Sequence, residues 1–166
     1  MVPDLDLQLQ VVLKALADNI KPAVDPADKV AVEQLHLAIA TLTMVRERLP
    51  VYRAFIRRLL EDDLAMAGDI VSAAGESAAL EAAMSAAKAA LADPEMDARE
   101  LELARNVLTG ETVSVIAGIN DGPGVAALMP VVLKRAKPQL ERLRAWCASS
   151  GFEPNPDEFR TLSELI

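Results

Sequence analysis

The sequence predicts an all-α protein, an irregular and mostly antiparallel bundle of six to seven helices in one domain spanning residues 1–166. Apolar residues recur every three or four positions over most of the chain, which is the period of an α-helix. The composition is 52% hydrophobic and only 3% aromatic. The core must therefore consist of Ala, Leu, Val, Ile and Met, of which Ala and Leu are strong helix formers. Proline and glycine fall mostly between the periodic segments, where they separate the helices.

Two helices are predicted in the first fifty residues. The first covers residues 4–20 and carries its apolar stripe at Leu5, Leu9, Val12, Leu16 and Ile20. The second begins at Asp25-Pro26, an N-cap followed by a proline in the first turn, and ends at Leu49. Further apolar residues lie opposite its main stripe, at Leu37, Ala40 and Met44. We therefore expect the second helix to have neighbours on two sides.

The third, fourth and fifth helices follow in the middle of the chain. Pro50 interrupts the pattern, and its predecessor Leu49 is biased away from helical geometry, so the chain either turns back or kinks there. A compact domain favours the turn. The third helix covers residues 51–74 with Gly75 as its C-terminal cap. The fourth, rich in alanine, covers residues 76–92, and Asp93-Pro94 opens the fifth.

The final third of the chain gives weaker signals. Residues 112–116 contain enough β-branched side chains to form a strand, but a lone strand would have no partner. We therefore extend the fifth helix through them. Residues 120–124 form a turn. A sixth helix covers residues 125–149, kinked or restarted at Pro138, with an inner stripe of Leu140, Leu143 and a core thiol, Cys147. A loop over residues 151–154 and a short terminal helix opened by Asn155-Pro156 complete the chain.

Charge and cysteine usage restrict the function. The formal net charge is −8, so the chain as a whole repels nucleic acid and anionic membranes, and neither is expected as a partner. The single cysteine excludes an internal disulfide and fits a reducing compartment. An acidic N-terminus unlike a signal peptide, and the lack of an apolar run of about 20 residues, predict a cytoplasmic protein.

Standard catalytic and metal-binding motifs are absent from the sequence. It has no Gly-rich phosphate loop, no HExxH, no CxxC pair and no GxSxG. One histidine and one cysteine cannot supply a usual zinc site. A single Glu-x-x-His occurs, Glu33 to His36, whereas di-iron bundles use two. We therefore expect no metal and no cofactor.

One carboxylate breaks the helical pattern. Asp63 falls within the apolar stripe of the third helix, where an ionised group is costly unless something pairs with it. If the chain reverses near Pro50, His36 lies at the same height as Asp63 on the neighbouring helix, and we predict that the two side chains approach within hydrogen-bonding distance, directly or through one water. Such a pair would either fix the helix register or act as an acid/base pair, with Asp63 orienting His36.

Arginines cluster around the junction of the second and third helices. Arg46, Arg53 and Arg57 are the candidates for an anion site, since arginine binds phosphate or carboxylate with two parallel hydrogen bonds. Alternatively, the cluster is a solvated surface. It could also pair with residues 61–121, which contain thirteen acidic and three basic residues.

The leading functional hypothesis is a non-catalytic helical protein that acts through association, as a homodimer or as an accessory subunit of a larger system. The first alternative is a binding module for an apolar or acyl-type small molecule with an anionic head near the arginines. The second is an enzyme that uses His36 and Asp63.

Overall fold

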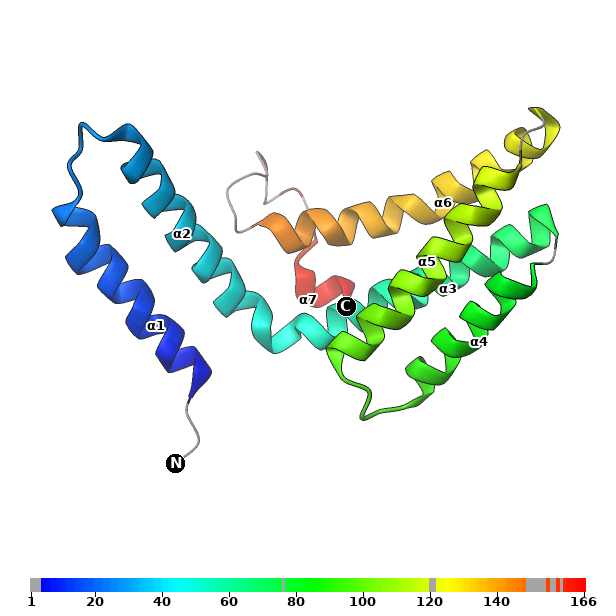
Figure 1. Ribbon diagram of the computed structural model, residues 1–166, viewed down its shortest axis with the longest axis horizontal. Coiled ribbons are helices and arrows are strands. Elements are labelled where there is room, and N and C mark those ends of the chain that lie inside the picture. Colours follow the sequence, from blue (N-terminus) through cyan, green and yellow to red (C-terminus); the bar gives the residue numbers. More distant parts are fainter. Residues whose placement is uncertain (1–3, 76, 120–121, 149–154, 156–157, 159) are drawn as a thin grey trace. The chain divides into compact units, whose positions relative to one another are not determined.

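The computed structural model describes residues 4–75, 77–119, 122–148, 155, 158 and 160–166, and the described residues contain helices and no strand (Figure 1). The all-α prediction is confirmed. The chain divides into two compact units, Met1–Val51 with Trp146–Glu158 and Tyr52–Ala145 with Phe159–Ile166. This division does not test the prediction of one domain, since a domain can contain more than one compact unit.

The first unit contains a helical hairpin. Helix α1, Leu5–Ala15, continues through a π-helical turn, Leu16–Ile20, and a 3-10 turn, Lys21–Ala23. Helix α2, Lys29–Arg48, returns beside it. The side chain of Asp4 caps α1 by accepting a hydrogen bond from the amide of Leu7 at 3.2 Å.

The predicted start of the second helix at Asp25-Pro26 is wrong by a few residues. The Asp25 side chain accepts a hydrogen bond from the amide of Ala27 at 2.9 Å and so forms a turn. The cap is Asp28, which accepts from the amide of Ala31 at 3.0 Å. A short aspartate side chain reaches the amide two residues on as readily as a helix amide three residues on, and the later aspartate takes the capping position.

The second predicted Asp-Pro start, at residues 93–94, is wrong for the same reason. Asp93 accepts from the amide of Glu95 at 2.8 Å, and helix α5, Ala98–Gly118, begins after Asp97. Asp97 accepts from the amide of Glu100 at 2.8 Å, and the Glu100 side chain accepts from the amide of Asp97 at 3.3 Å. This reciprocal capping box satisfies two amides that the helix leaves unpaired.

Replacing the Asp97 cap tests this start of α5. Asp97→Ala should lower the free energy of unfolding by about 1 kcal/mol, the usual cost of losing an N-cap. Asp93→Ala is the matched control and should cost less, because Asp93 closes a turn outside the helix. Urea denaturation followed by circular dichroism measures both. Equal losses would contradict this assignment.

The backbone between α2 and α3 stays helical. Leu49–Val51 forms a 3-10 helix, and Leu49 has φ −50 and ψ −45 although it precedes a proline. Helical backbone thus replaces the expected turn, because a proline near the start of a helix removes no hydrogen bond that the helix would have formed. Helix α3, Tyr52–Ala74, ends at Gly75, whose φ of 95 favours glycine, as predicted.

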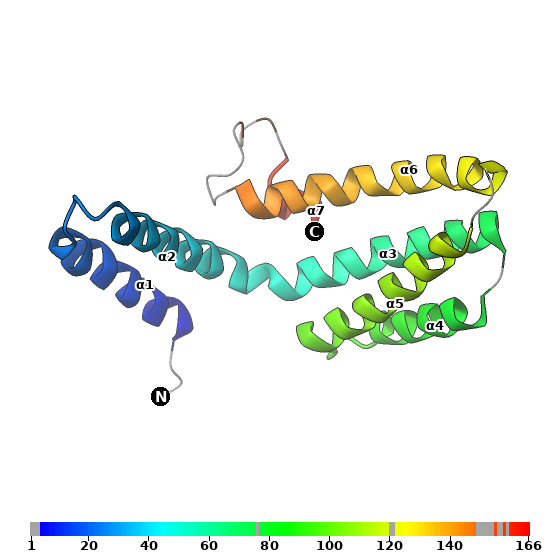
Figure 2. The same cartoon turned by 45° about the horizontal axis from the view of Figure 1, so that its top comes forward.

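The second unit is built on α3, α5 and α4, Ala78–Ala92 (Figure 2). Its core contains a full stripe from α3 and shorter stripes from α4 and α5: Phe55, Ile56, Leu59, Leu60, Ala67 and Ile70; Leu80, Ala83, Ala87 and Ala90; Leu101 and Leu108. Three of the four buried residues of α4 are alanines, so the helix backbones can approach closely. The predicted extension of α5 through residues 112–116 is confirmed.

Helix α6, Gly122–Cys147, runs through both Pro130 and Pro138. The predicted turn at 120–124 is only partly described, and its described residues, 122–124, belong to α6. The predicted inner stripe is wrong, because Leu140, Leu143 and Cys147 are exposed. The buried residues of α6 are Leu128, Arg142 and Ala145. The side of α6 that faces inward carries the polar side chains that bind carboxylates of α3, as described below.

The C-terminal helix α7, Leu162–Leu165, buries both of its leucines. It belongs to the second unit. The predicted loop at 151–154 and Pro156 of the predicted Asn155-Pro156 cap lie outside the described residues.

Candidate functional site

An ion pair closes the hairpin of α1 and α2. Arg46 on α2 donates from Nε to Asp6 Oδ1 at 2.6 Å and from Nη2 to Asp6 Oδ2 at 3.0 Å. These hydrogen bonds lower the pKa of Asp6 and raise that of Arg46. The pair joins the start of α1 to the end of α2, so the two helices are antiparallel (Figure 1).

One side of the hairpin carries two apolar stripes with alternating spacings of three and four residues. We call them together the hairpin face, and they consist of Leu5, Gln8, Val12 and Ala15 on α1, and of Ala31, Leu35, Ala38, Leu42, Val45 and Leu49 on α2 and its end. Viewed from the N-terminus of its own helix, each stripe lies roughly a quarter turn away from the side that contacts the other helix of the hairpin. The rotation has the same sense in both helices. Because the helices are antiparallel, this rotation brings both stripes to one side. The hairpin face contains no charged residue.

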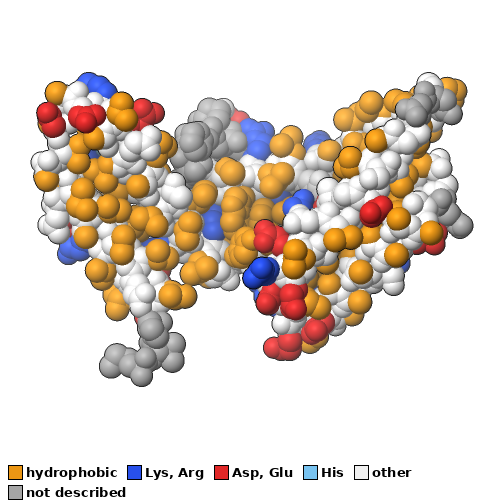
Figure 3. Space-filling model, in the orientation of Figure 1, with side chains coloured by type: hydrophobic (Ala, Val, Ile, Leu, Met, Phe, Trp, Pro, Cys, Tyr) orange, Lys and Arg blue, Asp and Glu red, His pale blue; other side chains and the backbone are white. Residues whose placement is uncertain are grey.

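The hairpin face is largely exposed, with Ala15, Ala31, Leu35 and Leu42 half-buried and its other residues exposed. Every residue of α1 and α2 is described, and none is buried. Leu5 is 59% exposed, Val12 47% and Val45 41%. Figure 3 shows hydrophobic side chains gathered over α1 and α2, with charged side chains mostly toward the ends and edges of the pair. A hairpin whose apolar side chains are at most half-buried gains little stability from its own packing, since most helical stability comes from burial of an apolar face.

Asp63 is buried, and side chains of α5 and α6 are its partners. Its Oδ2 lies 2.7 Å from Arg105 Nε and accepts a hydrogen bond from the Thr109 hydroxyl at 3.3 Å. Its Oδ1 accepts from the side-chain amide of Gln139. The expectation that a buried carboxylate needs a partner is thus met three times within the second unit.

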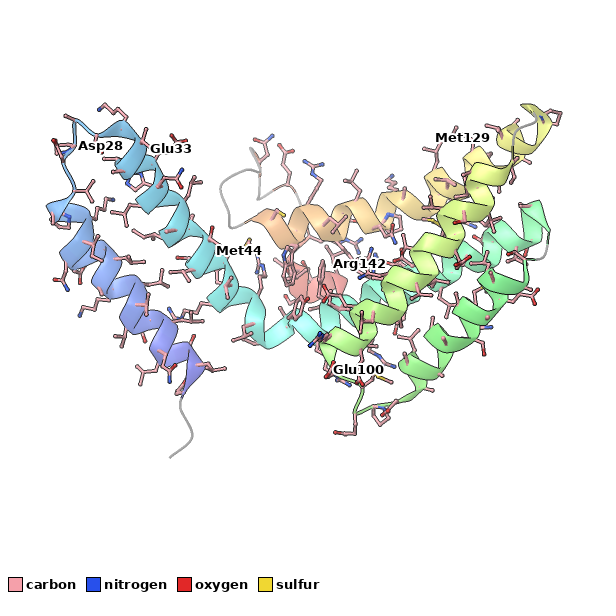
Figure 4. All side chains as sticks on the ribbon, in the orientation of Figure 1. Asp28, Glu33, Met44, Glu100, Met129 and Arg142 are labelled. Atoms are coloured by element: carbon pink, nitrogen blue, oxygen red, sulfur yellow. The ribbon has the colours of Figure 1, made fainter. Side chains whose placement is uncertain are left out.

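A second carboxylate, the half-buried Asp62, pairs with the buried Arg142 of α6, which is labelled in Figure 4. Arg142 Nη2 donates to Asp62 Oδ1 at 3.1 Å, and Nη1 lies 2.9 Å from Oδ2. Burial raises the pKa of Asp62 and lowers that of Arg142, while each charge partly offsets the effect on the other. The helical pattern of the sequence gave no indication that Asp62 and Arg142 pair.

His36 lies on α2 in the first unit, whereas Asp63 belongs to the second. With Lys21 and Leu35 it lines a pocket of about 200 Å³, completed by Val24, Pro26 and Val32. This volume is below the roughly 300–1,000 Å³ of typical small-molecule sites. The acid/base role of His36 and Asp63 stays a prediction.

The candidate anion-binding arginines have partners within the chain. Arg46 binds Asp6. Arg53 donates to the carbonyls of Pro94 and Met96, and Arg57 donates to the carbonyl of Leu91. Arg53 and Arg57 therefore cap the C-terminal end of α4 and the turn after it, where carbonyl groups lack helical partners and the helix dipole favours positive charge. The hydrogen-bond acceptors of Arg53 and Arg57 are carbonyls in the acidic half of the chain, and Arg57 Nε also lies 3.7 Å from the carboxylate of Glu61 in that half.

The described part of the chain offers no cluster of three or more His, Cys, Asp or Glu side chains that could hold a metal ion. None of its helices has the length and apolarity that crossing a membrane requires. Comparison with protein-family models, curated proteins and solved structures finds no match for this chain. The fold and the exposed hairpin face define the class: an all-α helical protein with a large uncharged apolar surface.

Proposed function

We propose that this chain is a non-catalytic helical protein that acts through association with another protein, and that the hairpin face is its docking surface. The observation that carries the proposal is the exposure of an uncharged apolar surface two helices wide in a hairpin without a single buried residue. Large exposed apolar surfaces of soluble proteins mark interaction sites. Coverage by a partner would supply the burial that the hairpin lacks.

The test is site-specific photo-crosslinking in the cells that produce the protein. A photoreactive benzoylphenylalanine replaces Val45 or Val12 on the hairpin face, and Leu37 serves as the control. Leu37 lies on the same helix but off the face, and its exposure of 43% matches the 41% of Val45. We expect a discrete covalent product with a protein at both face positions and none at Leu37, with the partner identified by mass spectrometry.

The outcome at the face positions decides the proposal. A single protein product shared by positions 12 and 45 supports docking through this face. Absence of any protein product at either position, or equal products at position 37, would overturn it.

The small-molecule alternative has less support. The arginines proposed to hold an anionic head are bound to Asp6 and to backbone carbonyls. A second pocket, of about 370 Å³ and lined by Asp69, Ser72, Ala73, Pro130, Val131 and Lys134, is wide open to solvent. Native mass spectrometry separates the two hypotheses, since a bound molecule adds a reproducible mass that denaturation removes.

A further inference from the structure

We infer that the partner of the hairpin face is a second copy of this chain, and that two hairpins pack face to face as a four-helix bundle. This inference rests on the proposed function and names the occupant of the same surface. It follows from three properties of the hairpin face: its heptad spacing, its area and its lack of charge.

The spacing is that of a helix-bundle seam. Residues 31, 35, 38, 42, 45 and 49 alternate steps of four and three, and residues 5, 8, 12 and 15 alternate three and four. Such steps keep an apolar stripe facing a neighbouring helix along its whole length. Each helix of the hairpin therefore presents one side to its partner within the hairpin and a second side, a quarter turn away, to a helix outside it. This is the arrangement of every helix in a four-helix bundle.

The area fits two hairpins. Helix α2 has 20 residues and is about 30 Å long, and two helices packed 8–10 Å apart present a face roughly 18–20 Å wide. Because α1 has only 11 residues and is about 16 Å long, face-to-face packing would bury about 420 Å² per copy and about 840 Å² in total. Specific stable interfaces begin near 1,000 Å², so we expect a weak dimer that dissociates on dilution.

The lack of charge favours a second copy over a partner of opposite charge. A two-fold axis packs one surface against an identical copy of itself, so a face carrying charges of one sign would bring like charges together. The hairpin face avoids this repulsion because Gln8 is its only strongly polar member. Its alanines, residues 15, 31 and 38, allow close approach of facing backbones.

The test is native mass spectrometry and light scattering of the purified full chain over a dilution series from about 100 to 1 μM, the range in which an interface of this size dissociates. A reducing agent is included because Cys147 is exposed and could form an intermolecular disulfide. We expect a dimer at high concentration and dissociation on dilution. Val45→Lys should weaken dimerisation at least about tenfold, because it places two unpaired charges in the interface.

Two further variants test whether the effect of a charge is confined to the hairpin face. Leu37→Lys introduces the same charge at an equally exposed site of α2 off the hairpin face, and the dimer should persist. Val12→Lys should weaken the dimer as Val45→Lys does, and circular dichroism verifies that each variant is folded. A chain that is monomeric at every concentration, or a dimer that Val45→Lys leaves intact, overturns the inference. A crosslink from position 45 to a different protein would retain the proposed function and overturn only the self-association.

Discussion

Replacing Arg142 with methionine is expected to lower the free energy of unfolding of the second unit by about 3–5 kcal/mol, the usual cost of removing one partner of a buried ion pair. Its side chain is only 5% exposed. It binds Asp62, donates to the carbonyl of Leu165 at 3.0 Å, and donates to the carbonyl of Pro138 at 3.0 Å. The substitution leaves the half-buried Asp62 carboxylate without its main counter-charge, and it removes one hydrogen bond between α6 and the C-terminal helix. Urea denaturation at pH 7 measures the loss.

The pH dependence of this loss distinguishes a charge effect from lost packing. Burial raises the pKa of Asp62 above its unfolded value, so its contribution favours the folded state at low pH and is lost as the pH rises through the folded-state pKa. Arg142 opposes this shift. Without Arg142 the pKa of Asp62 should rise further, and the loss of stability should be smaller near about pH 4 than at about pH 7.

A double variant is the control for this prediction. Asp62→Leu combined with Arg142→Met removes both charges and should recover part of the stability, because paired apolar replacements of a buried ion pair are often neutral or stabilising. A loss that is independent of pH and undiminished in the double variant would contradict the role assigned to the ion pair.

Truncation of Leu60 to alanine is expected to cost about 2–5 kcal/mol, the range for buried leucines whose removal leaves a cavity. Leu60 lies on α3 and is 0% exposed. The rest of the core limits how far the site can collapse, since α4 packs mainly through alanines that have little volume to move into the gap. Denaturation by urea, followed by circular dichroism, gives the value.

The matched control for Leu60→Ala is Leu133→Ala. Leu133 lies on α6 and is 62% exposed, so its truncation should change the free energy of unfolding by no more than about 0.5 kcal/mol. Comparable losses at both positions would show that α6 buries its outer face in the folded protein. That outcome would contradict the packing described for the second unit.

Local sequence signals predicted most helices well, because helix period and capping depend on residues a few positions apart. The extension of α5 through a β-branched segment and the end of α3 at Gly75 are examples. The errors at Asp25 and Asp93 arose because an aspartate before proline can close a turn as readily as it can cap a helix. In each case a second aspartate, three or four residues on, caps the helix.

The orientation of α6 could not be predicted from periodicity. Its exposed leucines have the spacing of a buried stripe, yet Arg135, Gln139 and Arg142 face α3 instead. Arg135 donates to Asp69 at 2.7 Å. Gln139 binds Asp63 and Arg142 binds Asp62, so the three side chains bind three of the carboxylates of α3. Long polar side chains bridge the two helices, because a carboxylate left in the interior without a partner is strongly destabilising.

By itself, the sequence determined the all-α class, most helix boundaries and the need of Asp63 for a partner, because each depends on the period of one helix or on contacts between near neighbours in the chain. The tertiary structure alone decided that Arg105, Thr109 and Gln139 supply that partner. It also decided that Arg53 and Arg57 cap α4, and that both stripes of the hairpin fall on one side. Periodicity indicates which side of a helix is apolar, but which element faces that side depends on contacts between residues far apart in the chain.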